Sequence, residues 1–431
     1  MKKALLCILA VVTLHTSLLL SQDISGDWQG IVGGPPGGLR TILRITKSNG
    51  GWSAQMFDID QIPDPIPVSS ITLDGTDLKY SIDLLHGSYT GKLSVDGSSI
   101  SGTWNQGQSF PLNFTRATKE TAWSTDPSPH TVKLILVEKD VKLEVLDWGG
   151  SGRPLILLAG LGDTAHIFDH FAPKLTSSYH VYGITRRGYG ASSAPVPAND
   201  NYSADQLGDD VLAVIAALNL NRPILAGHSM AGEELSSIGS RHPEKVAGLI
   251  YLDALSAYSF YDRPKGNLII DADDLLKKLG QLVSNTTPRE QKATVEELLH
   301  SSLPQIERDL KQRYEELGKT PEPANGSVPP ATMPEMPAVD KAILMGMQKY
   351  TEIKVPVLAI VAFPHDLDPN SKEDPAARVT AEANESAFLK AFEAGVPSAH
   401  VVRLAHADHY VFQSNEPDVL REIARFTASL P

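Results

Sequence analysis

Short apolar strands that alternate with amphipathic helices constrain the fold of residues 131–431 more than any other feature of the sequence. The strand-like segments are PLILLAG, YHVYGIT, RPILAGHS and VAGLIYLDA. Strands that are apolar on both faces are typical of a buried parallel sheet covered by helices. The clearest intervening helix is SADQLGDDVLAVIAALNL, where Ser203 and Gln206 form a capping box and apolar residues recur at helical spacing. The sequence therefore predicts an α/β fold with a mainly parallel sheet.

This alternation stops between residues 256 and 354, where charged helix-favouring runs precede a Pro-rich stretch. The sheet pattern resumes with VPVLAIVA, and a helix, the strand AHVVRLA and a final helix follow. An insertion between two strands of an α/β domain is usually a lid over the binding site. We expect residues 256–354 to form a helical cap whose Glu, Lys and Arg runs face solvent.

Residues 22–116 show a different pattern, in which short alternating strands are separated by Asx-Gly pairs such as Asp74-Gly75 and Asp96-Gly97. These pairs are typical of tight hairpins, because such turns need positive φ. We expect a small antiparallel all-β domain, and residues 117–130 fit a linker. Its predicted core residues are Trp28, Leu78, Tyr80, Ile82 and Trp104. The pattern leaves three roles open for this domain: a carbohydrate binder, a dimerisation module or a second lid.

Residues 1–21 are typical of a secretory signal peptide, because MKK gives a positive start and the following segment is almost continuously apolar. The alternative is an uncleaved membrane anchor, since Leu19 stands where cleavage favours a small residue. The apolar run is slightly short for a span. We therefore expect cleavage and an exported protein, periplasmic or secreted, with no stable membrane span.

Cysteine content and charge exclude several classes of function. The only cysteine, Cys7, lies in the leader, so the mature chain would hold no disulfide, thiolate metal site or cysteine nucleophile. The formal charge of −13 argues against nucleic acid as a partner, because phosphate binding needs a concentrated basic surface.

One turn in the parallel-strand region has the pattern of a nucleophile elbow: Gly227-His228-Ser229-Met230-Ala231-Gly232. It follows the apolar strand PILA and precedes a helical run, as an elbow requires, with Ala231 in place of the usual second glycine. A serine hydroxyl at such a turn becomes a nucleophile only when a histidine takes its proton. We predict Ser229 as the nucleophile and expect His228, its neighbour, to point away from the attacking face.

Together these features resemble the α/β-hydrolase superfamily, and the resemblance covers Thr131 to the C-terminus. In that family the nucleophile, the acid and the histidine follow in chain order, and a cap is often inserted after the sixth strand. Similar serine hydrolases carry a D-x-R-G-x-G-x-S stretch after the fourth strand. Here the stretch reads TRRGYGAS, so Thr185 replaces the first Asp.

The resemblance implies a base after the last strand and an acid after the strand before it. His409 fits the base better than His406, because an aromatic residue, an apolar pair and the terminal helix follow it. Asp366 fits the acid best, with Asp368 as the alternative. Asp253 stands where some relatives place an acid after the sixth strand, but we expect it to be a strand-end residue.

The family also implies an oxyanion hole made of the backbone N–H groups of Leu161 and Met230. Relatives usually carry His-Gly where this chain has Ala159-Gly160, and the donor survives that change because it is backbone. The resemblance thus implies an exported serine hydrolase that cleaves carboxylic esters of small molecules through Ser229, His409 and Asp366. It implies no cofactor and no metal.

Several alternatives stay open at this stage. Lactone hydrolysis, aminopeptidase or amide cleavage, C–C hydrolysis and perhydrolysis use the same triad and differ in pocket walls. A haloalkane dehalogenase or epoxide hydrolase is disfavoured, because the nucleophile of those relatives is an Asp. A non-catalytic binding protein on this fold is less favoured, because all three triad members are present. The sequence does not indicate the acyl-chain preference or the oligomeric state.

Overall fold

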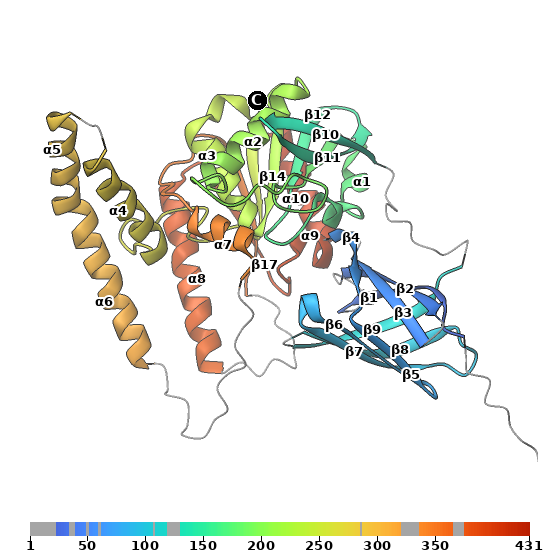
Figure 1. The fold of residues 1–431 in the computed structure, drawn as a ribbon. Helices are drawn as coiled ribbons and strands as arrows, with labels where there is room; N and C mark the ends of the chain where they lie inside the picture. The colour runs from blue at the N-terminus through green and yellow to red at the C-terminus, as the bar shows by residue number, and fades with distance from the viewer. Residues whose placement is uncertain are drawn as a thin grey trace, which may run out of the picture.

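The computed structural model describes residues 23–33, 39–48, 51–58, 62–106, 108–118, 130–284, 287–319, 336–364 and 375–431. They form two domains, each built on one sheet (Figure 1). The predicted leader, most of the predicted linker, Asp366 and Asp368 lie outside the described residues. No helix in the described ranges is long and apolar enough to span a membrane.

The N-terminal domain is a nine-stranded antiparallel sheet in the order β4-β3-β2-β1-β9-β8-β7-β6-β5. Its strands are β1 (Gly26–Val32), β2 (Leu39–Ser48), β3 (Gly51–Asp58), β4 (Ile62–Pro67), β5 (Ser70–Asp74), β6 (Asp77–Ile82), β7 (Gly87–Leu93), β8 (Ser99–Gln106) and β9 (Gln108–Arg116). The predicted antiparallel domain is therefore confirmed. Its core contains all five aromatic and aliphatic side chains predicted from the alternation: Trp28, Leu78, Tyr80, Ile82 and Trp104.

The second domain is an eight-stranded mixed sheet in the order β10-β11-β13-β12-β14-β15-β16-β17. Its strands are β10 (Thr131–Glu138), β11 (Val141–Gly150), β12 (Arg153–Leu158), β13 (Tyr179–Ile184), β14 (Ile224–His228), β15 (Gly248–Leu252), β16 (Val357–Ala362) and β17 (Ala399–Leu404). Strands β10 and β11 pair in antiparallel fashion, and the pairs from β12 to β17 are parallel. The central strands β14, β15 and β16 are buried along their whole length, which explains their continuous apolar sequence.

Helices cover both faces of this sheet, and two separate apolar clusters fill the spaces between helices and strands. The helices are α1 (Ala172–Leu175), α2 (Ala204–Ala217), α3 (Gly232–Arg241), α8 (Pro375–Gly395), α9 (Val411–Ser414) and α10 (Glu416–Ala428). The Ser203 hydroxyl caps α2 by accepting from the Gln206 N–H, which is one of the two bonds of the predicted capping box. The Gln206 side chain donates to Asp210 instead of to the Ser203 backbone. Short 3₁₀ turns are η1 (Asp83–Leu85), η2 (Ala165–Phe168), η3 (Ser229–Ala231) and η4 (Pro243–Lys245).

Between β15 and β16 the chain forms a separate group of helices (Figure 1). These are α4 (Leu268–Leu282), α5 (Pro288–Glu297), α6 (Leu303–Lys319) and α7 (Ala338–Met345), with the π turn η5 (Leu298–Ser302) joining α5 and α6. Helices α4, α5 and α6 stand to one side of the sheet, whereas α7 returns toward its centre. The insertion therefore begins after β15, the strand that pairs with β14, at the carboxyl edge of the parallel strands.

The two domains meet through buried charges. Arg40 of β2 donates to the Asp169 carboxylate at 3.3 Å, and both side chains are almost fully buried. Leu39 packs against the same apolar cluster that contains α9 residues. In Figure 1 the nine-stranded sheet accordingly lies beside the α9 end of the second domain. This end also carries the loop that holds His409.

Candidate active site

Ser229 stands at a sharp turn between β14 and α3, with φ of 51°, a left-handed conformation that a serine rarely adopts. The turn is crowded: a Cβ added at Gly227 would lie 3.0 Å from the Ala231 Cβ. Glycine at 227 thus compensates for the alanine at 231. The strand, turn and helix that the elbow pattern predicts are all present at Ser229.

His409 lies on the loop between β17 and α9, and its Nε2 is 2.8 Å from Ser229 Oγ. The histidine side chain is 46% exposed, so the reacting atoms are open to solvent and to a substrate. The structure therefore brings Ser229 and His409 together, as the sequence interpretation expects. His406 is exposed on the same loop, at a φ of 60°.

The acid in contact with His409 is Asp253, and this corrects the expectation for Asp366. Asp253 Oδ2 lies 2.7 Å from His409 Nδ1, and Asp253 is 8% exposed. Asp366 and Asp368 fall outside the described residues, while the imidazole nitrogen that an acid would bind already has a carboxylate partner. Asp253 is therefore more than the strand-end residue that we expected.

Local packing explains why Asp253 reaches the histidine. Asp253 follows β15 with φ of 47°, which turns the chain sharply at the sheet edge. Its Oδ1 accepts from the Ala362 N–H at the end of β16, at 2.9 Å, so the second oxygen is fixed toward His409. Gly232 allows the chain after Asp253 to pass close to α3, because a Cβ there would lie 2.2 Å from the Ala254 carbonyl oxygen.

His228 contacts both the backbone and the ring of His409. Its Nε2 lies 3.0 Å from the backbone oxygen of His409, and the two rings are 4.6 Å apart. Burial, together with the neighbouring His409, lowers the pKa of His228 to about 3, so the ring is neutral and Nε2–H donates to this oxygen. His228 thus fixes the backbone of the loop that carries His409 and, as expected, is not the base.

The loop after β12, which supplies Leu161, passes directly against the nucleophile. A Cβ at Gly160 would lie 3.1 Å from Ser229 Cβ and 3.0 Å from His228 Nδ1, so only glycine fits there without displacement. Leu161 and Met230 belong to one apolar cluster. Their backbone N–H groups as oxyanion donors remain a prediction.

Thr185, which replaces the expected Asp, contacts the C-terminal end of the loop after β12. We call this loop, residues 159–164, the oxyanion loop because it contains Leu161, the predicted donor. Its hydroxyl donates to Glu144 Oε2 at 2.6 Å and accepts from the Ala165 N–H at 3.0 Å. The Thr185 hydroxyl and the Glu144 carboxylate of β11 together make the hydrogen bonds at this position. The substitution therefore leaves the turn tied to the oxyanion loop.

Side chains from three elements form an apolar wall next to Ser229. Met230, Leu161 and Tyr258 pack in one cluster with α7, whose Ile343 is fully buried there. Tyr258, in the segment between β15 and α4, lies near Ser229, and burial raises the pKa of its hydroxyl. The sequence interpretation missed Tyr258, because an isolated tyrosine in an insertion carries no motif.

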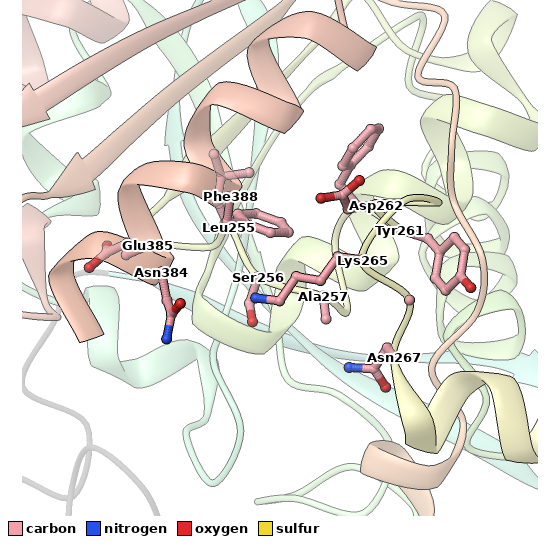
Figure 2. A pocket seen from close by; sticks show the side chains of 12 residues that line it. Leu255, Ser256, Ala257, Tyr261, Asp262, Lys265, Asn267, Asn384, Glu385 and Phe388 are labelled. Atoms are coloured by element: carbon pink, nitrogen blue, oxygen red, sulfur yellow. The ribbon is translucent and has the colours of Figure 1, made fainter. Parts of the chain in front are cut away.

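A separate pocket of about 330 Å³ lies between the chain after β15 and α8 (Figure 2). Asn384 and Glu385 on α8 face one side of it, and Asn267 stands on the other. Leu255, the lining residue nearest in sequence to the triad, comes two residues after Asp253. This pocket does not include Ser229 or His409 among its lining residues, so it is distinct from the space at the nucleophile.

One group of side chains has the composition of a metal site, at the domain junction. Ligand atoms of His130, His166 and Asp169 lie within 4.8 Å of one another. Burial alone would lower the pKa of His166, but hydrogen bonds to Asp169 and Glu144 outweigh it and raise the value to about 10. A protonated imidazole cannot bind a metal, and Arg40 already neutralises Asp169. The group fits a charge network that joins the domains.

Comparison with known proteins agrees with the fold. Residues 153–318 match the family described as the alpha/beta hydrolase fold. A fluoroacetate dehalogenase of Burkholderia sp is 35% identical over 116 residues, which cover 26% of this chain and 38% of that protein. The AB hydrolase superfamily protein YisY of Bacillus subtilis is 34% identical over 147 residues, covering 33% of this chain and 53% of that protein. The chain thus spans less than two thirds of either relative.

Among solved structures, E-2-(acetamidomethylene)succinate hydrolase aligns with 70% of this chain and 100% of its own, at 20% identity and a TM-score of 0.42. The eight-stranded mixed sheet and the family match together show an α/β-hydrolase fold in the second domain. An additional N-terminal antiparallel domain precedes this fold in the chain.

Proposed function

We propose that this protein is a serine hydrolase that cleaves carboxylic esters through Ser229, His409 and Asp253. The observation that carries the proposal is the pair of contacts at His409: 2.8 Å to Ser229 Oγ and 2.7 Å to the Asp253 carboxylate. This is the geometry in which an imidazole can take a serine proton while a carboxylate stabilises the resulting imidazolium.

In the proposed reaction, Ser229 Oγ attacks the ester carbonyl carbon and its proton passes to His409 Nε2. The negative charge that develops on the carbonyl oxygen is bound by the backbone N–H groups of Leu161 and Met230. Collapse of the tetrahedral species breaks the bond to the alcohol, which leaves with the proton from Nε2. Water then repeats the sequence on the acyl-enzyme and releases the carboxylic acid.

The surroundings of Ser229 support an acyl substrate with an apolar part. Met230, Leu161 and Tyr258 pack with residues of α7 immediately beside the nucleophile. Apolar side chains at this position match the hydrocarbon of an acyl group and favour it by removing its surface from water. We place the acyl group along this wall and not in the pocket of Figure 2, because neither Ser229 nor His409 lines that pocket.

Export is a further part of the proposal. Its support is the sequence of residues 1–21, with a basic start followed by an apolar run. An enzyme outside the cytoplasm would meet its esters in the periplasm or the medium.

Turnover of p-nitrophenyl esters of increasing acyl length tests the proposed chemistry. We expect hydrolysis by the wild-type protein and loss of at least roughly 10³-fold in kcat for S229A and H409A. H406A is the matched control, since His406 lies on the same loop and is exposed. Its activity should stay within about threefold of wild type. No hydrolysis of any ester by the wild type, or equal loss in H406A, would overturn the proposal.

A further inference from the structure

We propose that Arg186, held by Glu234, is a positioning residue that orients the oxyanion loop toward the nucleophile. The inference rests on the proposed function, because it assigns a role within the same site. Arg186 follows Thr185 at the end of β13, and Glu234 lies in the first turn of α3, five residues after Ser229. The hydrogen bonds of Arg186 go to Glu234 and to two backbone carbonyls, not to Ser229 or His409, so the effect of the pair must pass through the backbone.

The Arg186 guanidinium makes four hydrogen bonds that link the loop to the nucleophile helix. Nε and Nη2 donate to the two carboxylate oxygens of Glu234, at 2.7 and 3.0 Å. Nη1 donates to the carbonyl oxygen of Gly160 at 3.1 Å, and Nη2 donates to that of Ala159 at 3.0 Å. Both side chains are 4% exposed. A planar fork with five donors suits this arrangement, and a lysine could not reproduce it.

Because the peptide unit is planar, the hydrogen bond from Arg186 to the Gly160 carbonyl also orients the Leu161 N–H, the predicted oxyanion donor. The Gly160 carbonyl and the Leu161 N–H belong to one planar trans peptide unit, in which the C=O and N–H bonds point in opposite directions. Holding the Gly160 oxygen against Arg186 therefore directs the Leu161 N–H away from Arg186. A cationic donor on the carbonyl also polarises the peptide, which strengthens its N–H as a hydrogen-bond donor.

The other end of the pair lies on α3, which follows the turn η3 that carries Ser229 and Met230 without a break. Glu234 comes five and four residues after them, so a bidentate bond to it ties the oxyanion loop to the helix that continues from this turn. The close passage of Gly160 over Ser229 Cβ, at 3.1 Å for an added Cβ, leaves no space for the loop to shift inward. The distance between the Leu161 and Met230 N–H groups thus depends on the ion pair of Arg186 and Glu234.

The neighbouring pair Arg187 and Asp210 offers a matched control. Arg187 donates to Asp210 at 2.6 Å, and both side chains are at least as buried as the first pair. The guanidinium of Arg187 also donates to the Asn201 carbonyl and to Glu138, not to the oxyanion loop. A loss of stability or activity that follows from removing any buried ion pair should therefore appear when either pair, Arg186–Glu234 or Arg187–Asp210, is replaced.

The test replaces each pair by apolar residues, R186M/E234L and R187M/D210L, because such double changes remove both charges of a buried pair. Glu138, the other partner of Arg187, is 51% exposed and stays hydrated when Arg187 is replaced. For R186M/E234L we expect kcat on a p-nitrophenyl ester to fall about 10²-fold, the size of losing one oxyanion donor, with KM within threefold. A trifluoromethyl ketone, which mimics the tetrahedral species, should bind more weakly by a similar factor. R187M/D210L should keep kcat within about fivefold.

Hydrogen–deuterium exchange of the backbone amides in residues 158–168 provides a readout that needs no turnover. Exchange should accelerate in R186M/E234L and stay near the wild-type rate in R187M/D210L. Wild-type kcat, or unchanged exchange, in R186M/E234L would overturn the role of Arg186. Faster exchange in a protein whose wild type cleaves no ester would instead refute the proposed function and leave the loop-holding role supported.

Discussion

At the scale of single residues, the site depends on which carboxylate holds His409. Two acids follow neighbouring strands of one parallel sheet, Asp253 after β15 and Asp366 after β16. The carboxyl ends of adjacent strands open onto the same edge, so chain order alone allows either to face the histidine. The structure places the Asp253 carboxylate 2.7 Å from His409 Nδ1, and the bond from the Ala362 N–H fixes the other oxygen of that carboxylate.

Exchanging each acid for its amide tests this assignment. D253N should lower kcat/KM by on the order of 10³- to 10⁴-fold, because an amide favours the wrong imidazole tautomer and cannot stabilise the imidazolium. D366N and D368N are the controls and should stay within about threefold of wild type. Ester turnover is the measurement, with a circular dichroism spectrum to confirm folding. A large loss in D366N alongside an active D253N would restore the acid expected from the sequence.

His228 predicts a dependence of stability on pH. The pKa of its ring is about 3 in the folded chain, against about 6.5 in an unfolded one, so the unfolded chain binds more protons between these values. Stability from this group is present above pH 6.5 and is lost as the pH falls toward 3. Between pH 7 and pH 5 the loss should be about 2 kcal/mol.

Urea unfolding of wild type and H228Q at both pH values measures that contribution. Glutamine can still donate toward the His409 carbonyl but does not titrate, so the drop in the free energy of unfolding should be smaller in H228Q by about 2 kcal/mol. Equal drops in the two proteins would show that His228 is not the neutral buried ring described above.

At the scale of elements, the strands and the position of the helical insertion were predictable, but the contacts that the insertion makes were not. Continuous apolar sequence marks β14, β15 and β16 because both of their faces are covered, and the elbow pattern marks the turn at Ser229. The insertion after β15 was visible as a break in this pattern. The sequence did not indicate which segment of the insertion returns to Ser229. That depends on contacts such as the one between Val339 and Gly188, where a Cβ added at Gly188 would lie 2.6 Å from Val339 Cγ1.

Helix α7 should set the length of acyl chain that the site accepts. Ala342 packs in the cluster beside Met230, so A342F would fill part of the wall next to Ser229. We expect the ratio of kcat/KM for octanoyl over acetyl ester to fall at least about tenfold, since a pocket discriminates by roughly 1–3 kcal/mol per methylene. M345F is the control, on the same helix at an exposed position. An unchanged ratio in A342F would place the acyl group elsewhere.

At the scale of the whole molecule, two domains of different architecture are joined by buried charges that sequence patterns could not reveal. The β-domain pattern and the α/β pattern each predicted their own sheet correctly. The link between Arg40 and Asp169 spans residues 129 positions apart, and His130 and His166 complete it only in the folded chain. No local spacing connects these residues, so only the structure identifies them as a group.

Two arginines of the same strand test the importance of this junction. R40A removes one partner of a buried pair, which should lower the free energy of unfolding by about 3 kcal/mol. R44A breaks the exposed pair with Asp27, whose side chains are 49% and 35% exposed, and should cost less than about 1 kcal/mol. Calorimetry gives both values. Equal shifts would mean that Arg40 contributes no more at the junction than a surface residue.

The central claim is that Ser229 is a nucleophile activated by His409, and covalent labelling tests it most directly. A fluorophosphonate reacts with an activated serine, and mass spectrometry of the digested protein locates the adduct. We expect one adduct per chain, on the peptide that contains Ser229, in wild type and in H406A, and none in S229A or H409A. An unlabelled wild type, or an adduct on another serine that persists in S229A, would contradict it.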